Sequence, residues 1–166
     1  FLGIPLYFLL FHVERALGAD PASVRWAYAN AYLLNLWISV FWSALGAVFL
    51  FFLCRDHFQY TEKSAIAISV LYSLGTLVFP FDSQIWGHST AAAFLLLALW
   101  CFFGGRAALG GFFVGLAIFT EYLVLPVLPA FAFFFWREKK TPREIATAFL
   151  GALPGVLGLL IFQRTT

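Results

Sequence analysis

Four polar side chains capable of chemistry stand close together in the stretch FPFDSQIWGHST: Asp82, Gln84, Trp86 and His88. A carboxylate and an imidazole six positions apart on a short loop can point into one cavity. There they can bind a phosphate or an acceptor group, or together ligate a divalent metal. A structural interpretation stays open, because Asp82 can cap a turn and His88 or Ser89 can cap a helix. Trp86 is typical of a membrane-interface anchor.

Glu121 is a second candidate, in the stretch AIFTEYLVLP, where Tyr122 follows it. It lies between two apolar blocks with no basic residue near it in sequence. An ionisable side chain at such a depth is costly unless it is paired or faces a wet cavity. The pattern therefore favours a residue that lines a site, with a plain carboxylate at a helix end as the alternative.

The composition indicates which solvent surrounds these residues. Of the 166 residues, 63% are hydrophobic and 11% are charged, whereas an ordinary soluble domain is roughly 45–50% apolar and about 25% charged. One water-soluble core could not hide so many apolar side chains, so we expect an integral membrane protein. The sequence contains no methionine, which predicts an internal fragment of a longer chain.

Charged residues divide the chain into apolar blocks, and the blocks predict an all-α, polytopic transmembrane bundle. We expect residues 1–166 to be part of one transmembrane domain, with a juxtamembrane helix lying along the interface at 1–17. The expected spanning helices lie near 31–53, 64–80, 89–103, 107–120, 122–136 and 145–162.

Lys and Arg predict the orientation, because cytoplasmic loops carry an excess of both. If the 31–53 span runs inward, seven basic residues are cytoplasmic: Arg55, Lys63, Arg106, Arg137, Lys139, Lys140 and Arg143. Three lie outside: Arg15, Arg25 and Arg164. The 82–88 loop and the turn at Glu121 then share the extracytoplasmic face of the cell membrane.

The remaining motifs indicate packing rather than chemistry. Gly111 with Gly115, and Gly151 with Gly155, have the small-xxx-small spacing of tight helix contacts. Pro126 and Pro129 are expected to kink their helix, and Cys54 and Cys101 are interpreted as lipid-facing or packing thiols. The sequence has no phosphate-cradling glycine loop, zinc-ligand spacing or nucleophile elbow.

The order of these pieces resembles the membrane-embedded GT-C glycosyltransferases, the group that holds protein O-mannosyltransferases and the aminoarabinose transferase of lipid A. The stretches LGIPLYFLLFHVERALG, RDHFQYTEKSAIAISVLYSLGTLVFPF, FDSQIWGHSTAAAFLLLAL and GGFFVGLAIFTEYLVLPVLPAFAFFFW carry the resemblance. Many members have an Arg and an Asp in the short outer loop and a Lys in the later turn. This chain has His88 and Glu121 there, like a bacterial subgroup with GH and TEY at these places.

The resemblance implies an enzyme of the hexosyltransferase type that moves a sugar from a polyprenyl-phosphate-linked donor to a glycan, lipid or protein acceptor. Its general base would be an Asp in an outer loop before this stretch, so no catalytic residue is expected here. The substrate-binding candidates are Asp82, Gln84, His88, Glu121 and Tyr122. A divalent metal could be held by His88 and Glu121, and no nucleic acid is expected.

Two other functions stay open from the sequence. The first is a non-enzymatic polytopic protein, such as a transporter or lipid flippase, although these six blocks show none of the internal repeats common in transporters. The second is an assembly subunit without chemistry, whose polar outer loops would tolerate alanine.

Overall fold

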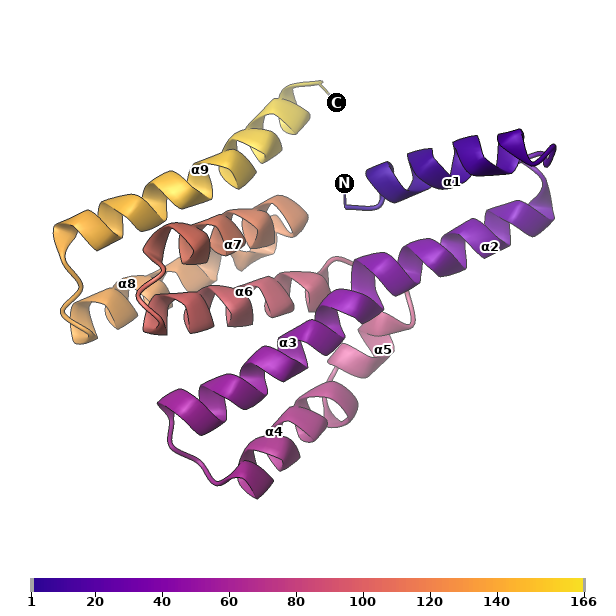
Figure 1. The fold of residues 1–166 in the computed structure, drawn as a ribbon. Helices are drawn as coiled ribbons and strands as arrows, with labels where there is room; N and C mark the ends of the chain where they lie inside the picture. Colours follow the sequence, from indigo (N-terminus) through magenta and orange to yellow (C-terminus); the bar gives the residue numbers. More distant parts are fainter. Residues whose placement is uncertain (1, 166) are drawn as a thin grey trace.

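The computed structural model describes residues 2–165, and every element in that range is helical, which confirms the all-α prediction. Figure 1 shows the helices running back and forth along one another. In chain order the elements are α1 (Ile4–Ala16), α2 (Val24–Asn35), the π-helical η1 (Leu36–Val40), α3 (Phe41–Phe52), the π-helical η2 (Leu53–His57), α4 (Glu62–Gly75), α5 (Val78–Asp82), α6 (His88–Phe103), α7 (Ala107–Thr120), the 3-10 helix η3 (Tyr122–Val127), α8 (Leu128–Arg137) and α9 (Pro142–Thr165).

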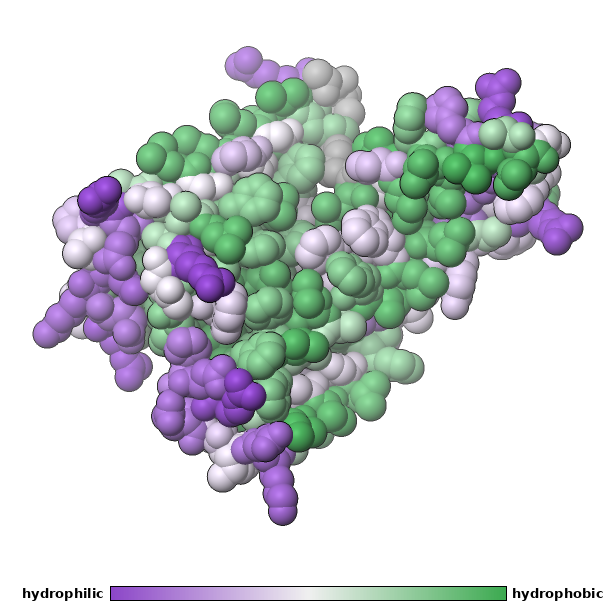
Figure 2. Space-filling model, in the orientation of Figure 1, coloured by the Kyte–Doolittle hydropathy of each residue, from purple (hydrophilic) through white to green (hydrophobic). Residues whose placement is uncertain are grey.

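Two helices in the described range are long and apolar enough to cross a membrane. One is the continuous helix Val24–His57, which joins α2 to η2, and the other is Pro142–Arg164. The apolar helices His88–Phe103, Ala107–Thr120 and Tyr122–Arg137 are shorter. Figure 2 shows apolar side chains over the middle of the visible face and hydrophilic ones gathered toward its ends. These features indicate a membrane protein, while a bundle with six crossings stays a prediction.

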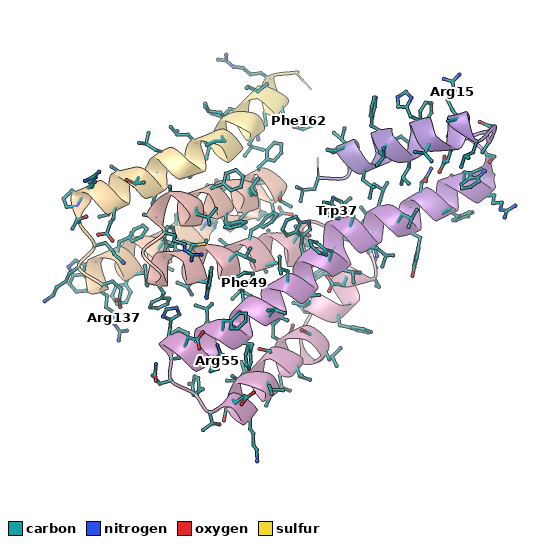
Figure 3. The ribbon with its side chains drawn as sticks, in the orientation of Figure 1. Arg15, Trp37, Phe49, Arg55, Arg137 and Phe162 are labelled. Atoms are coloured by element: carbon teal, nitrogen blue, oxygen red, sulfur yellow. The ribbon has the colours of Figure 1, made fainter. Side chains whose placement is uncertain are left out.

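The two ends of the bundle differ in charge. We call one of them the basic end, and its connections and helix termini hold Arg55, Lys63, Arg106, Arg137, Lys139, Lys140 and Arg143. At the other end, which we call the His88 end, residues 83–87 join α5 to α6 and Glu121 follows α7. Figure 3 labels Arg55 and Arg137 toward the basic end and Arg15 at the far side of the molecule.

The core is centred on α6, which lies between α3 and α7 and buries most of its residues. Phe94 is fully buried there, and Ala91, Ala98 and Ala117 are almost completely buried around it. Small residues let the backbones approach closely, and in lipid this close packing, rather than hydrophobic exclusion, drives helix association. Cys54 and Cys101 are free and buried, so they are packing thiols rather than lipid-facing ones.

Glycines bring α7 and α9 into backbone contact. A methyl group at Gly111 would overlap the backbone carbonyl of Ala148, and one at Gly151 would overlap that of Ala108. Gly115 and Gly155 face each other in the same way. The prediction that both small-xxx-small pairs are helix-packing sites is confirmed.

Two of the expected spanning helices are interrupted. The block at 64–80 forms α4 and the short α5, with Thr76 and Leu77 between them. The hydroxyl of Thr76 donates to the carbonyl of Tyr72 (2.6 Å) and accepts from the amide of Val78 (3.2 Å). Pro80 has no N–H with which to continue the helical ladder through this point.

The block at 122–136 forms η3 followed by α8. Pro126 lies inside η3, and Pro129 is in the first turn of α8, where its missing N–H costs nothing. A kink at the two prolines was expected, but the 3-10 geometry of all six residues of η3 was not.

The N-terminal helix α1 folds back along α2 as an antiparallel hairpin (Figure 1). A helix was expected at 1–17, of which Phe1 lies outside the described residues. The helix Val24–His57 has 34 residues and is about 51 Å long, well over the ~30 Å of bilayer hydrocarbon. The hairpin buries Glu14, whose carboxylate accepts a hydrogen bond from the Asn30 side chain (3.2 Å).

Candidate functional site

His88 and Glu121 form an ion pair at the His88 end. The imidazole Nδ1 of His88 lies 2.9 Å from Oε2 of Glu121, and the two side chains are 33% and 18% exposed. His88 is the first residue of α6 and Glu121 directly follows α7. The two helices are antiparallel neighbours of nearly equal length, 16 and 14 residues, joined by a short turn. This hairpin returns the chain to the same level and brings the two residues together.

A close backbone approach fixes the position of the pair. A Cβ atom at Gly87 would lie 3.0 Å from Cγ2 of Thr120 and 3.1 Å from its carbonyl oxygen, tighter than ordinary side-chain contacts. The hydroxyl of Thr120 is turned back onto its own helix, where it donates to the carbonyl of Leu116 (2.8 Å). The motifs GH and TEY therefore touch through two adjacent residue pairs.

Aromatic rings enclose the imidazole. The ring of Trp86 is nearly parallel to that of His88, with centroids 5.5 Å apart, and Phe81 meets it edge-on at 5.1 Å. The indole Nε1–H of Trp86 donates to Oε1 of Gln84 (2.6 Å). Because Nδ1 of His88 faces Oε2 of Glu121, Nε2 is the ring nitrogen left to contact a ligand.

Side-chain hydrogen bonds hold residues 82–86 against the long helix Val24–His57. Asn35 donates to the carbonyl of Asp82 (2.8 Å), and the hydroxyl of Ser39 lies within donating distance of the carbonyls of Gln84 (3.1 Å) and Trp86 (3.2 Å). The hydroxyl of Thr90 donates in turn to the carbonyl of Ile38.

The last of these contacts falls in the π-helical turn η1. A π turn inserts an extra residue and leaves part of the regular hydrogen-bond ladder unmade, and such turns are frequent at functional sites. Here the turn contributes both the Ile38 carbonyl and the buried hydroxyl of Ser39. The polar loop is therefore a fixed part of the bundle and not a freely hydrated connection.

Sequence reasoning missed Asn35, Ser39 and Thr90 because it searched the apolar blocks for charges. The signal was present: Asn35 and Ser39 are spaced i, i+4 inside a block that is otherwise apolar. Neutral polar residues on one face of a membrane helix commonly bond to a neighbouring segment. Glu14 was also missed, because its helix was interpreted only as lying along the interface.

The other predicted site residues do not join the pair directly. Asp82 ends α5 and is bonded through its backbone carbonyl, Gln84 is exposed and bonded to Trp86, and Tyr122 is 56% exposed beside Glu121. The interpretation of His88 or Ser89 as the cap of a helix is wrong. The N-cap of α6 is Gly87, and no side chain makes a capping hydrogen bond there.

Several buried polar side-chain atoms in α2, α4, α5 and α6 have no hydrogen-bond partner among the described residues. They are Oδ1 of Asn35, the hydroxyl of Tyr72, Oδ1 of Asp82 and Oγ of Ser89. The side-chain amide of Asn35 donates to the backbone carbonyl of Asp82, and Ser89 follows His88 in sequence. Buried polar atoms without partners are rare in proteins and each one calls for an explanation, such as a ligand or water that completes it.

Metal binding has limited support. No group of three or more His, Cys, Asp or Glu side chains in the part of the chain that the structure describes could hold a metal ion. His88 and Glu121 could supply two ligands, fewer than a protein metal site normally uses.

Two cavities flank α8 rather than the ion pair. One, of about 360 Å³, is lined by residues that include Tyr72, Leu96 and Phe134, and the other, of about 1290 Å³, lies between α7, α8 and α9. Neither is lined by Asp82, His88 or Glu121. A ligand would therefore reach the pair from the surface of the His88 end, where both side chains are partly exposed.

Comparison of the chain with protein-family models, curated proteins and solved structures finds no match. The resemblance to GT-C glycosyltransferases therefore stays a prediction from the sequence motifs.

The His88–Glu121 pair has the chemistry to bind an anionic group or to exchange a proton. A carboxylate beside Nδ1 fixes the orientation of the imidazole. The other ring nitrogen can then donate to a phosphate oxygen or exchange a proton with a hydroxyl. The N-terminal turn of α6 adds backbone amides and the positive end of the helix dipole beside it, which favours an anionic ligand. Trp86 offers an aromatic face on which a sugar ring can stack.

Proposed function

We propose that the chain is part of a membrane-embedded glycosyltransferase that moves a sugar from a polyprenyl-phosphate-linked donor to an acceptor on the extracytoplasmic side. One observation carries the proposal: the GH and TEY motifs, which lie at opposite ends of the α6–α7 hairpin in sequence, meet through the Gly87–Thr120 packing and the His88–Glu121 ion pair. Both motifs belong to the stretches that resemble the GT-C group.

In this proposal the bundle crosses the membrane six times, through the helix Val24–His57, α4 with α5, α6, α7, η3 with α8, and α9. The basic end faces the cytoplasm, in keeping with the excess of Lys and Arg there. The His88 end and the α1–α2 hairpin then lie on the extracytoplasmic side, in the inner membrane of a cell envelope.

Helix length supports a site just inside the membrane boundary. The 16 residues of α6 and the 14 of α7 rise about 24 Å and about 21 Å, less than the ~30 Å hydrocarbon thickness. With their basic ends in the headgroups, His88 and Glu121 lie several ångströms below the outer surface. A lone charge at that depth is costly, and mutual pairing lowers the cost.

The chemistry assigns binding roles to these residues. The acceptor oxygen forms a bond to the anomeric carbon of the sugar, the bond from that carbon to the phosphate oxygen breaks, and polyprenyl phosphate leaves. The acceptor proton passes to an Asp carboxylate, expected in a part of the enzyme that precedes these residues. Nε2 of His88 donates to the phosphate, Glu121 keeps the imidazole oriented, and Trp86 stacks on the sugar.

The buried polar atoms without partners fit this role. Oδ1 of Asp82 and Oγ of Ser89 lie on either side of the loop that carries His88. A sugar has several hydroxyl groups that can donate to and accept from such atoms. Hydrogen bonds from these hydroxyl groups to the unpaired atoms would stabilise the bound donor.

The test is a transfer assay with the full-length protein in proteoliposomes, supplied with radiolabelled polyprenyl-phosphate hexose and an acceptor extract. His88→Gln and Glu121→Gln should each lower the rate at least about tenfold, equivalent to about 1.4 kcal/mol of transition-state stabilisation. The double variant should be no worse than the more impaired single variant, because the two side chains act as one unit.

His57→Gln is the matched control, since His57 stacks on Phe103 at the opposite end of the molecule, with ring centroids 4.6 Å apart. It should keep the wild-type rate. No transfer by the wild-type protein, or full transfer by both site variants, would reject the proposal and return the chain to the transporter or assembly-subunit alternatives.

A further inference from the structure

The larger cavity has an apolar wall and a cationic end. It holds about 1290 Å³ between α7, α8 and α9. Its apolar lining comes from α7, α8 and α9 and includes Val114, Ile118, Phe131, Ala132, Phe149 and Val156. At the basic end it is lined by Trp136, Arg137, Lys139 and Lys140.

The cavity follows from unequal helix packing. Glycines hold α7 and α9 in backbone contact, so these two helices form a closed wall. The helix α8 consists mostly of large residues, LPAFAFFFWR, and none of its residues is buried. It stands away from the wall, and most of the residues that line the space between them are apolar.

The charges at the cavity end are only partly neutralised. Lys140 Nζ lies 3.5 Å from Oε1 of Glu144, and the other carboxylate oxygen of Glu144 accepts from Thr141. Among the described residues, Arg137 and Lys139 have no ion-pair partner. Lys139 has a left-handed backbone (φ 49°), and its amide donates to the carbonyl of Trp136 (3.2 Å).

The dimensions match one leaflet of a bilayer. The ten residues of α8 rise about 15 Å, half of the ~30 Å hydrocarbon thickness. The cavity extends from Leu128 and Pro129, at the start of α8, to Arg137 at its end. Trp136 is 75% exposed beside the cations, as is common for a Trp at headgroup level.

We infer that this cavity binds an anionic phospholipid of the leaflet at the basic end. Its phosphate lies between Arg137 and Lys139, and an acyl chain lies along α8 between Phe131 and Val156. Charge complementarity selects the anionic headgroup, and basic pockets between membrane helices on the cytoplasmic side are known to bind such headgroups. This site is separate from the His88–Glu121 pair and does not depend on the proposed transfer activity.

The first test identifies the occupant directly. Ala132 is exposed to the cavity, so p-benzoylphenylalanine can replace it in the full-length protein without disturbing the core. After irradiation in membranes that contain phosphatidylglycerol and phosphatidylcholine, mass spectrometry should find the cross-link mainly on phosphatidylglycerol. A cross-link to another segment of the same chain, to a second copy, or to both lipids in proportion to their abundance would overturn the inference.

The second test measures the charge contribution. In native mass spectrometry, the double variant Arg137→Gln/Lys139→Gln should retain phosphatidylglycerol with an affinity lower by on the order of tenfold. The matched control Arg106→Gln/Lys63→Gln removes one Arg and one Lys from the same end but outside the cavity lining. The control should retain the lipid like the wild type, and equal loss in both double variants would contradict a specific site.

Discussion

At the residue scale, the imidazole of His88 has a defined environment that its neighbours in sequence do not create alone. Glu121 contacts its Nδ1, and Trp86 and Phe81 contact its ring. Ser39, from a helix far away in the chain, is fully buried and holds the carbonyls of the same loop. The position of the candidate site therefore depends on one hydroxyl as much as on the charged pair.

Ser39→Ala tests this dependence. The substitution removes the donor for the Gln84 and Trp86 carbonyls and leaves partly buried acceptors unpaired, which costs about 1–3 kcal/mol of folding free energy. Reversible unfolding in mixed micelles measures the cost, and the transfer rate should fall together with it. Ser73→Ala is the control, because the Ser73 hydroxyl donates only within its own helix, to Ser69 (3.0 Å). Equal stability of the two variants would contradict the role of Ser39.

Sequence reasoning identified the ionisable residues of the site but not the atoms that hold them. Glu121 was selected because an unpaired charge in an apolar chain is costly, and His88 because it and Asp82 can point into one cavity from a short loop. The structure pairs His88 with Glu121. Asp82 instead makes its contact through its backbone carbonyl. Which polar group meets which depends on helix packing, and a single sequence does not record that.

At the element scale, the strongest determinant of the fold is the glycine contact between α7 and α9. Because the backbones touch, the α6–α7 hairpin and α9 form one layered unit, and α8 is left apart as a wall of the larger cavity.

Gly111→Ala should weaken this contact. The added methyl group would overlap the carbonyl of Ala148, so the helices must separate, at a cost of about 1–3 kcal/mol. Gly75→Ala is the control, because its methyl group would meet only the Leu71 side chain at 3.5 Å and should change stability by less than about 0.5 kcal/mol. Unfolding in mixed micelles compares the two, and a Gly111→Ala variant as stable as wild type would show that the helices are not in backbone contact.

The elements themselves were predictable to different degrees. The block 107–120 coincides with α7, and 89–103 falls one residue short of α6, because charges and glycines mark their ends. The break between α4 and α5 and the π turn η1 were not predicted. At both places a threonine hydroxyl, of Thr76 or Thr90, donates to a backbone carbonyl. The length of an apolar block does not predict such hydrogen bonds.

At the scale of the whole molecule, the two ends have different chemistry. The basic end has cations that line an apolar cavity, whereas the His88 end has the His88–Glu121 pair, which joins the start of α6 to the residue after α7. Figure 2 shows hydrophilic side chains toward the ends and apolar ones between them. In the proposed orientation, a structural lipid binds at the inner leaflet and the sugar donor at the outer leaflet.

The most direct measurement combines sidedness with donor binding at one residue. Tyr122 is exposed next to Glu121, and Tyr122→Cys can be labelled in full-length protein in which Cys54 and Cys101 are replaced by alanine. An impermeant maleimide added outside should label this cysteine and not one at Glu138, in the basic loop. Polyprenyl-phosphate hexose should slow the labelling, whereas polyprenyl alcohol should not. Labelling only from the cytoplasmic side, or a rate unaffected by the donor, would contradict an extracytoplasmic donor site at the His88–Glu121 pair.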